Sequence, residues 1–388
     1  MPFPDYNGGS IVNLMASLQG AMGGNRHSYP PLDLLASLPL GSYRKILLWV
    51  VDGLGVNYLR AHPEAEMLNA HLKGSITSVF PPTTATAVTT FLTGDAPQQH
   101  GLTGWHVYFR ELGAVLAVLP GRPRYGGVTL GEAGIDTGIL LGHTPFSDKI
   151  AYDSVMLSPA FIADSDFNRA HLGKARLVRH RNLPELTSQI VELLRNGKER
   201  YLYAYWSELD SIGHQSGIWS EEAERHLLEI DQAFSYLLEQ CRGTDSLIIV
   251  CADHGQIDTQ PSDRISLDDH PELLEMLSLP LCGEPRAAYC YLRPGSENDF
   301  DDYVKSELAE KAVAYQSSEL LEKNWFGLGL PNPQLTLRIG DRLLLMQGNY
   351  MIKDWLAQEK HYYLIGVHGG CSRDELQVPL IVSDMYLR

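Results

Sequence analysis

The stretch "KILLWVVDG", residues 45–53, is an apolar run that ends on an aspartate and a glycine. Three further stretches have the same form, a short apolar segment followed by residues that can do chemistry: "YLYAYWSELD" at 201–210, "SLIIVCADHG" at 246–255 and "YYLIGVHGG" at 362–370. Uninterrupted apolar strands separated by helical stretches are typical of a parallel sheet buried on both faces. The sequence therefore predicts an α/β fold, a three-layer sandwich whose central sheet is mostly parallel.

Residues 220–243 predict one of the covering helices. Ser220 can cap its N-terminus and Gly243 can end it. Its apolar side chains recur at helical spacing, at Leu227, Ile230, Phe234, Leu237 and Leu238. Near the N-terminus a shorter amphipathic helix is predicted from Ile11, Leu14, Met15 and Leu18.

The chain divides into three predicted parts. Residues 1–40 form an N-terminal helical extension, 41–280 together with 351–388 form the main domain, and 281–350 form a small inserted α+β subdomain. Residues 105–135 fit the sheet pattern poorly, because they mix aromatic, glycine and basic residues, and they predict a loop or hairpin near a site.

Within the insertion, two stretches carry the α+β prediction. "DFDDYVKSELAEKAV", residues 299–313, is typical of a helix. "LTLRIGDRLLLM", residues 335–346, predicts two strands joined at a Gly-Asp turn.

The net charge of −16, from 31 basic and 47 acidic residues, restricts the partners. A surface that binds a nucleic-acid polymer or an anionic membrane needs a basic patch, so neither partner is expected. An anionic small molecule would need a site where the local electrostatic potential is positive, and a bound metal ion supplies that positive charge.

The five cysteines are scattered and odd in number, with no C-x-x-C pair, so neither a disulfide framework nor a cysteine zinc site is indicated. The N-terminus carries Asp5 where a signal peptide would be basic, and no apolar window reaches 18 residues. Together these observations predict a soluble protein with reduced thiols and a cytoplasmic location.

The polar residues that follow the apolar runs form a candidate site. Ligands of parallel sheets bind beyond the carboxyl ends of the strands, so four such ends in one sheet would converge. Singly, an Asp-Gly turn, an i,i+4 Asp–His pair or a lone histidine is more often structural. Jointly they supply three carboxylates and three imidazoles, from Asp52, Asp210, Asp253, His214, His254 and His368.

This donor set suits Zn²⁺, with Mn²⁺ as the second choice. Six ligands are too many for one tetrahedral ion and about right for two, spaced roughly 4 Å apart. Two divalent ions and three aspartates would sum to about +1, which would attract a phosphate although the protein as a whole is acidic.

Five motifs carry a resemblance to a known family. "VVDGLG", "PPTTATAVTTFLTG … QHGLTG", "ELDSIGHQSG", "CADHGQID" and "GVHGG" occur in the order found in the nucleotide pyrophosphatase/phosphodiesterase family. That family belongs to the alkaline phosphatase superfamily of two-metal hydrolases, and the similarity spans about residues 45–380. It implies an alkaline phosphatase-like fold and cleavage of phosphodiester or pyrophosphate bonds in a small-molecule phosphate ester, without indicating an oligomeric state.

The resemblance also assigns the residues. One ion would lie among Asp52, Thr84, Asp253 and His254, and the other among Asp210, His214 and His368. In the family the nucleophilic threonine follows a proline by three residues and precedes the threonine of a T-G pair by nine. Counted from Pro81 and from Thr93, both spacings lead to Thr84. The implied mechanism is a double displacement through a covalent phosphothreonine, with the neighbouring threonines structural.

The sequence departs from the family pattern at the substrate. Nucleotide-cleaving members have "F-P-N" after the nucleophile, where this chain has "ATA" at 85–87. At the position of a phosphate-binding asparagine it has Trp105, followed by His106. Replacement contacts are predicted from Trp105, His106 and Arg110, with further candidates at Tyr108, Arg122 and Arg124.

Because of these departures, a phosphomonoesterase or a phosphonate hydrolase with the same two-metal site stays open as an alternative. A metal-dependent phosphoglycerate mutase is disfavoured, since such enzymes use a serine nucleophile in a different motif. A non-catalytic binding protein is disfavoured because all seven candidate site residues are present.

Overall fold

The structure is a computed structural model and describes residues 2–357 and 359–386. A seven-stranded main sheet has the order β2-β18-β9-β1-β8-β6-β7. Strands β9, β1, β8, β6 and β7 run parallel, and β18 is antiparallel to both of its neighbours. The predicted mostly parallel central sheet is thus confirmed. In chain order the strands are β1 (Lys45–Val51), β2 (Leu72–Thr77), β6 (Ser154–Pro159), β7 (Arg176–His180), β8 (Tyr201–Trp206), β9 (Ser246–Cys251) and β18 (Gln377–Asp384).

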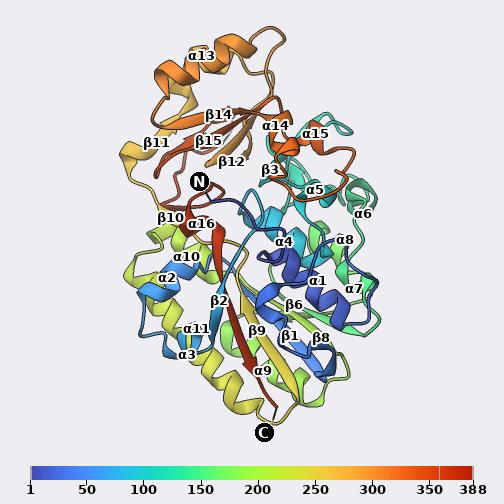
Figure 1. The fold of residues 1–388 in the computed structure, drawn as a ribbon. Helices are drawn as coiled ribbons and strands as arrows, with labels where there is room; N and C mark the ends of the chain where they lie inside the picture. The colour runs from blue at the N-terminus through green and yellow to red at the C-terminus, as the bar shows by residue number, and fades with distance from the viewer. Residues whose placement is uncertain (1, 358, 387–388) are drawn as a thin grey trace.

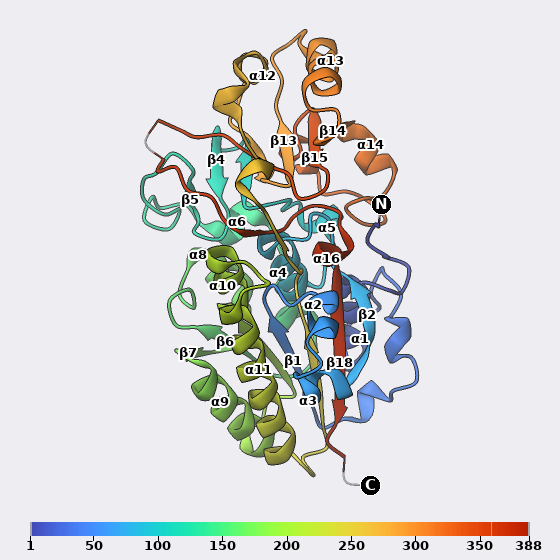
Figure 2. The ribbon, with the colours of Figure 1, turned by 90° about the vertical axis from the view of Figure 1, so that its left-hand side faces the viewer.

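Helices cover both faces of the main sheet, which completes the three-layer sandwich. In Figure 1, α1, α4 and α7 lie on one side and α2, α10 and α11 on the other. Figure 2 brings α9, α10 and α11 to the front. The helices around the main sheet are α1 (Ile11–Ala21), α2 (Val56–Ala61), α3 (Glu66–Ala70), α4 (Thr84–Thr93), α5 (Pro97–His100), α6 (Thr137–Leu141), α7 (Phe146–Lys149), α8 (Asp166–Leu172), α9 (Leu183–Asn196), α10 (Glu208–Ser216), α11 (Glu221–Gln240) and α16 (Arg373–Leu376).

Two of these helices were predicted from apolar periodicity. Helix α11 begins after Ser220, whose side chain accepts a hydrogen bond from the Ala223 N–H, and its predicted apolar stripe is buried. Helix α1 occupies the predicted N-terminal position with Ile11, Leu14, Met15 and Leu18 buried. Burial of one apolar stripe against the sheet stabilises each helix more than its local propensity does.

A second seven-stranded sheet, antiparallel at every pairing, lies above the main sheet in Figure 1 in the order β14-β15-β13-β12-β3-β4-β5. Along β15, alternate residues enter different apolar clusters. Leu344 joins the cluster of Phe300 in α13, and Leu345 joins that of Trp325 and Phe326. The elements are β3 (His106–Phe109), β4 (Ala114–Ala117), β5 (Arg122–Pro123), α12 (Pro271–Glu275), β12 (Cys282–Glu284), β13 (Ala287–Cys290), α13 (Glu297–Glu307), β14 (Ala312–Gln316), α14 (Ser317–Glu322), α15 (Leu335–Arg338) and β15 (Arg342–Met346).

Short elements connect the two sheets. Strand β10 pairs antiparallel with β17, and β11 pairs parallel with β16. These strands are β10 (Ile257–Asp258), β11 (Arg264–Ser266), β16 (Met351–Lys353) and β17 (Gly366–Val367). Elsewhere along the chain, single 3-10 turns occupy Asp33–Leu35, Leu40–Ser42, Pro261–Asp263 and Leu267–Asp269. Within the described residues, no helix combines the length and the apolar character needed to cross a bilayer.

The structure corrects two details. The strand pair predicted over 335–346 is wrong in its first half, because Leu335–Arg338 forms helix α15 and only Arg342–Met346 is a strand. The segment before His368 is not a strand of the main sheet, since β17 forms a separate two-stranded sheet with β10. The hairpin predicted within 105–135 exists as β3–β4, and it joins the second sheet where His106 pairs with Gly283. The division into 1–40, 41–280 with 351–388, and 281–350 stays a prediction, although the second sheet takes strands from outside 281–350.

Candidate metal centre and its pocket

Three parallel strands of the main sheet deliver the carboxylates. Asp52 follows β1, Asp253 follows β9, and Asp210 lies in the first turn of α10, just after β8. Gly53 adopts a φ of 77°, and a Cβ there would lie 3.0 Å from Cα of Asp210. The Asp-Gly sequence therefore allows two chain segments to approach closely enough for their carboxylates to share one site.

One group of potential ligands contains Asp52, Asp253 and His254. Nε2 of His254 lies 3.3 Å from Oδ1 of Asp52 and 3.4 Å from Oδ2 of Asp253. Oγ1 of Thr84 lies 3.1 Å from the same Nε2. Asp52, Asp253 and Thr84 therefore converge on an imidazole nitrogen of His254, the fourth residue that the resemblance places around this ion.

The second group contains Asp210, His214 and His368. Nε2 of His214 lies 3.3 Å from Oδ2 of Asp210, and Nε2 of His368 lies 3.9 Å from Oδ1 of Asp210. Nδ1 of His214 lies 2.7 Å from the Gly366 carbonyl oxygen. A proton on Nδ1 would complete that hydrogen bond and leave the Nε2 lone pair free for a metal ion.

The two groups are contiguous. The rings of His254 and His368 stack with centroids 3.7 Å apart, and His214 and His368 are 5.2 Å apart. A third set of potential ligands links the two groups. In Asp210, His254 and His368, one ligand atom from each residue lies within 4.8 Å of the others. All seven residues that the resemblance assigned therefore lie in a single cluster.

The electrostatics of the cluster favour bound cations. Burial, reinforced by Asp253 and Asp210, raises the pKa of Asp52, and burial likewise raises the pKa of Asp253. Tyr205 donates its hydroxyl hydrogen to Oδ2 of Asp52, and the Gly53 N–H donates to Oδ1 of Asp253. Among the described residues, the other oxygen of each carboxylate has no hydrogen-bond partner although it is buried.

These two unpaired oxygens are the ones closest to Nε2 of His254. An unpaired buried carboxylate oxygen is costly, and a divalent ion offsets that cost directly. The residues present therefore fit the two metal ions that the donor set predicted, with oxygen and imidazole ligands suited to Zn²⁺ or Mn²⁺.

Thr84 is the first residue of α4, and its side chain is partly accessible. The first N–H groups of a helix have no partner within the helix, so they face an anion placed near Thr84. The other threonines of this segment are buried. Thr89 and Thr93 donate to carbonyl oxygens one turn back at 2.6 and 2.7 Å, which is a structural role.

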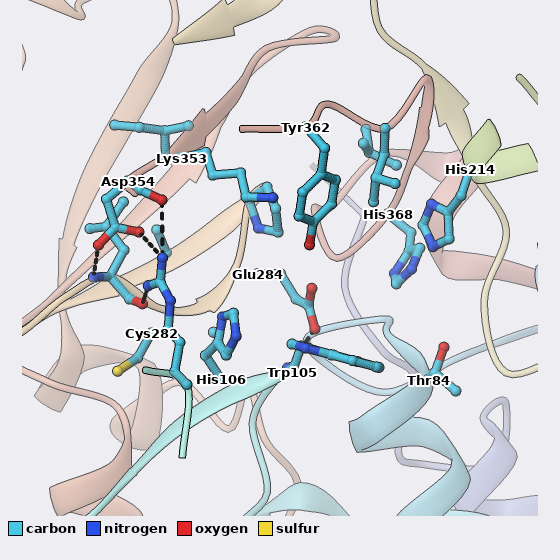
Figure 3. Close-up of a pocket in the computed structure, with 18 of the residues that line it drawn as sticks. Thr84, Trp105, His106, His214, Cys282, Glu284, Lys353, Asp354, Tyr362 and His368 are labelled. Atoms are coloured by element: carbon cyan, nitrogen blue, oxygen red, sulfur yellow. Dashed lines mark hydrogen bonds and ion pairs between the residues drawn. The ribbon is translucent and has the colours of Figure 1, made fainter. Parts of the chain in front are cut away.

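A pocket of about 280 Å³ extends from Thr84 and His368 toward the second sheet (Figure 3). The structure places two of the predicted substrate contacts, Trp105 and His106, in its wall. The third, Arg110, is exposed and is not among the lining residues. The ring of Tyr108 packs on Tyr291 with centroids 5.3 Å apart.

Arg124 lines the pocket, but other residues occupy its donors. Nε and Nη2 each lie 3.0 Å from a carboxylate oxygen of Glu359, and Nη2 lies 2.8 Å from Oδ1 of Asp354. Nη1 donates to the Leu281 carbonyl oxygen at 2.9 Å. The guanidinium therefore holds the side chains of Asp354 and Glu359 in place.

The lining residues that sequence reasoning missed include Glu284, Lys353 and Tyr362. Glu284 is buried, and its Oε1 accepts hydrogen bonds of 2.6 Å from the Thr83 hydroxyl and from the Trp105 N–H. Burial raises the pKa of Glu284 to about 7, against the lowering effect of those hydrogen bonds. The one available signal was an acidic residue inside a strand-like run, "LCGEPRAAYC".

The comparisons with known proteins agree with this geometry. A profile of the type I phosphodiesterase / nucleotide pyrophosphatase family matches residues 46–370. No curated protein matches the sequence.

Solved structures share the fold. Murine ectonucleotide pyrophosphatase/phosphodiesterase 5 is 18% identical, with a TM-score of 0.66 and 87% of each chain covered. The human protein of that name is 16% identical, with a TM-score of 0.65, and 89% of this chain and 90% of the other are covered.

Phosphonoacetate hydrolase from Sinorhizobium meliloti 1021, in complex with phosphonoformate, is 18% identical with a TM-score of 0.65. The alignment covers 93% of this chain and 92% of the hydrolase. At these identities the likeness concerns the fold, whereas the family profile extends over most of the sequence. The protein therefore belongs to the type I phosphodiesterase / nucleotide pyrophosphatase family and is a phosphoesterase.

Proposed function

We propose that the protein hydrolyses phosphodiester or pyrophosphate bonds, with Thr84 as nucleophile and two divalent ions as cofactors. One observation carries the proposal: Oγ1 of Thr84 lies 3.1 Å from Nε2 of His254, at the start of α4 and at the mouth of the buried carboxylate cluster. A hydroxyl in that position faces both the ligand groups and the pocket.

Asp52, Asp253, His254 and Thr84 would hold one ion, and Asp210, His214 and His368 the other. When bound, the ions supply positive charge that stabilises the phosphoryl oxygens and lowers the pKa of a coordinated oxygen. The donor set supports Zn²⁺ first and Mn²⁺ second.

The chain's own residues supply position and shape. The N–H groups at the start of α4 orient the phosphoryl group. Oγ of Thr84 attacks phosphorus, the ester or anhydride oxygen leaves, and a phosphothreonine forms. Water then cleaves the phosphothreonine, so that one water is consumed for each bond broken. Two hydrogen bonds to Glu284 fix the Thr83 side chain, next to Thr84, and the backbone of Trp105, which lines the pocket.

Phosphonate hydrolysis is a second candidate. Ala85 and Ala87 follow Thr84 and are buried, so no aromatic side chain from the start of α4 reaches the pocket to stack on a nucleobase. The phosphonoacetate hydrolase with the same fold has been solved with phosphonoacetate as well as with phosphonoformate. A phosphomonoester is a third class of substrate that the same two-metal site could hydrolyse.

Metal analysis combined with paired assays tests the proposal. Two ions per chain and chelator-sensitive hydrolysis of bis-p-nitrophenyl phosphate, faster than that of p-nitrophenyl phosphate, are expected. Monoester preference would favour a phosphatase, and activity on phosphonoacetate alone would favour phosphonate hydrolysis. Thr84→Ala should retain the metal and lose at least about 10³-fold in kcat. Wild-type turnover by Thr84→Ala would refute the nucleophile. The cytoplasmic location stays a prediction.

A further inference from the structure

Lys353 ends strand β16 and extends into the pocket toward Tyr362 (Figure 3). Its Nζ lies 3.5 Å from the ring centroid of Tyr362 and 4.3 Å from that of Trp355. In residues 2–357 and 359–386, no carboxylate lies within ion-pair distance of this ammonium group and no acceptor forms a hydrogen bond with it. Aromatic faces are its close neighbours.

The nearby acids have other partners. Asp354 and Glu359 both contact Arg124, whose side chain is only 3% exposed. His106 supplies no competing positive charge, because burial, together with Arg124, lowers the pKa of His106 to about 3. The pocket therefore contains one satisfied cation, Arg124, and one that lacks an anionic partner among the described residues, Lys353.

Lys353 loses part of its hydration by burial, and among the described residues no ion pair compensates for that loss. Burial lowers the pKa of Lys353 to about 8, although Glu359 raises it from a distance. The ammonium group is thus still mostly charged at neutral pH, while part of its hydration is lost. A ligand anion at this position would restore the lost interaction with a charge-assisted hydrogen bond.

Lys353 and the metal-ligand cluster occupy opposite ends of the pocket. Figure 3 shows Thr84, His214 and His368 at one end and Lys353 at the other, with Trp105, Glu284 and Tyr362 between. The pocket volume of about 280 Å³ lies just below the usual range for ligand sites, which is about 300–1,000 Å³. A compact molecule could therefore touch both ends.

We propose that Lys353 is an anion-binding subsite, so that the substrate is a compact phosphorus compound with a second anionic group, a carboxylate or a phosphate, beyond the bond that is cleaved. The proposal rests on the proposed function of Thr84 and the metal ligands, because it takes that end of the pocket as the place of the scissile phosphoryl group. Tyr362 and Trp105 would enclose the short connecting segment.

Isothermal titration of metal-loaded Thr84→Ala protein tests the subsite without turnover. The probes are phosphonoacetate, 3-phosphonopropionate and 4-phosphonobutyrate, each compared with the analogue in which a neutral carboxamide replaces the carboxylate, and methylenebisphosphonate compared with methylphosphonate, which lacks the second phosphonate. At least one probe with the second anionic group should bind about tenfold or more tightly than the analogue that lacks it. A larger preference among the carboxylates identifies a carboxylate substrate, and a larger preference for the bisphosphonate identifies a second phosphate.

In the same Thr84→Ala background, Lys353→Met should reduce the preference for the second anionic group to about twofold or less, and Lys353→Arg should retain most of that preference. Lys311→Met is the matched control, because Nζ of Lys311 also lies over an aromatic ring, 6.0 Å from Tyr350, but outside the pocket lining. If Lys353→Met fails to fold by circular dichroism, Lys353→Gln replaces it.

The proposal would be refuted if the Lys353→Met variant kept the full preference for the second anionic group, or if the Thr84→Ala protein itself showed no such preference. A failure of the proposed function can be distinguished from a failure of the subsite. It would appear as a lack of bound metal or of hydrolysis in the wild-type protein, whatever the titration gives.

Discussion

Arg286 and Glu375 form a buried, two-pronged ion pair, with Nε 3.0 Å from Oε1 and Nη2 2.9 Å from Oε2. Arg286 lies between β12 and β13 of the second sheet, and Glu375 lies in α16, directly before β18 of the main sheet. Oε1 of Glu375 also accepts a hydrogen bond from the Gly370 N–H at 2.7 Å. One carboxylate therefore ties the second sheet to the turn that follows His368.

Glu375→Gln should make stability less sensitive to acid. Burial would raise the pKa of Glu375, but Arg286 and the hydrogen bonds outweigh it, so the pKa lies below its usual 4.5. A depressed pKa stabilises the fold above about pH 4.5, and this contribution is lost as the pH falls below that value. Urea unfolding at pH 7 should show a loss of roughly 3 kcal/mol in the variant, and the difference from wild type should shrink toward pH 4.

The exposed pair of Glu319 and Lys323, 2.8 Å apart, provides the matched control. Glu319→Gln should change the free energy of unfolding by less than about 0.5 kcal/mol at either pH. An equal effect of both substitutions, or a Glu375→Gln deficit that does not depend on pH, would contradict the assigned role of the buried pair.

His214→Ala and His368→Ala should each lose about one metal ion per chain. Both imidazoles lie within 4 Å of Asp210, so either substitution removes a ligand from the same group and leaves the group of Asp52 and Asp253 intact. Elemental analysis of the purified variants measures this directly. Thermal unfolding should also become less sensitive to chelator than in wild type, because a bound ion stabilises the folded state by mass action.

His226→Gln is the control for those variants. His226 is also paired with an acid on its own helix, Glu229, at 2.7 Å. Its Nε2 accepts a hydrogen bond from the Trp206 indole at 2.9 Å, so both ring nitrogens are engaged. This variant should retain the metal content of wild type. Unchanged metal in His214→Ala and His368→Ala would refute the ligand assignments.

Much of the centre could be predicted because it depends on local sequence. Asp52, Asp253 and His254 come within three residues of the end of an apolar strand, and strand order in a parallel sheet brings such ends together without knowledge of side-chain packing. The register that pairs Val50 with both Tyr205 and Cys251 then aligns the three strand ends. His368 was predicted to lie beside these residues and it does, but the reasoning was partly wrong, since its strand β17 belongs to a two-stranded ribbon and not to the main sheet.

The far wall of the pocket could not be predicted, because contacts between distant segments create it. Glu284 acquires its role only when it meets Thr83 and the Trp105 backbone, 201 and 179 residues away in sequence. Lys353 differs from a surface lysine because its ammonium group lies over the rings of Trp355 and Tyr362. It also lacks an ion pair with Asp354, because Asp354 is paired with Arg124. No spacing pattern encodes such a combination.

Glu284→Gln should alter the pH dependence of stability in metal-free protein. A carboxyl whose pKa rises to about 7 on folding binds its proton more tightly in the folded state, so wild-type stability falls as the pH rises from about 4.5 to 7. The loss amounts to about 3 kcal/mol when complete. The amide side chain of the variant can still accept both hydrogen bonds at its Oε1 but does not titrate.

Thermal unfolding in the presence of chelator at pH 5 and pH 8 measures this effect. The melting temperature of Glu284→Gln relative to wild type should be higher at pH 8 than at pH 5. Glu64→Gln, a change at an exposed acid, serves as the control and should leave the pH profile unchanged. Parallel profiles for wild type and Glu284→Gln would show that Glu284 does not titrate in this range.

Substitution of Arg124 separates a structural from a substrate-binding arginine. Arg124→Met should cost roughly 3 kcal/mol in unfolding free energy, because it leaves Asp354 and Glu359 without their cation. The double variant Arg124→Met/Glu359→Gln should recover part of that loss, since one unpaired charge is removed. If Arg124 instead bound substrate, stability would stay near wild type and KM alone would rise. The exposed Arg110 provides the comparison. Arg110→Ala should leave the free energy of unfolding close to that of wild type and kcat/KM within about twofold of it, because the Arg110 side chain is exposed and lies outside the pocket lining.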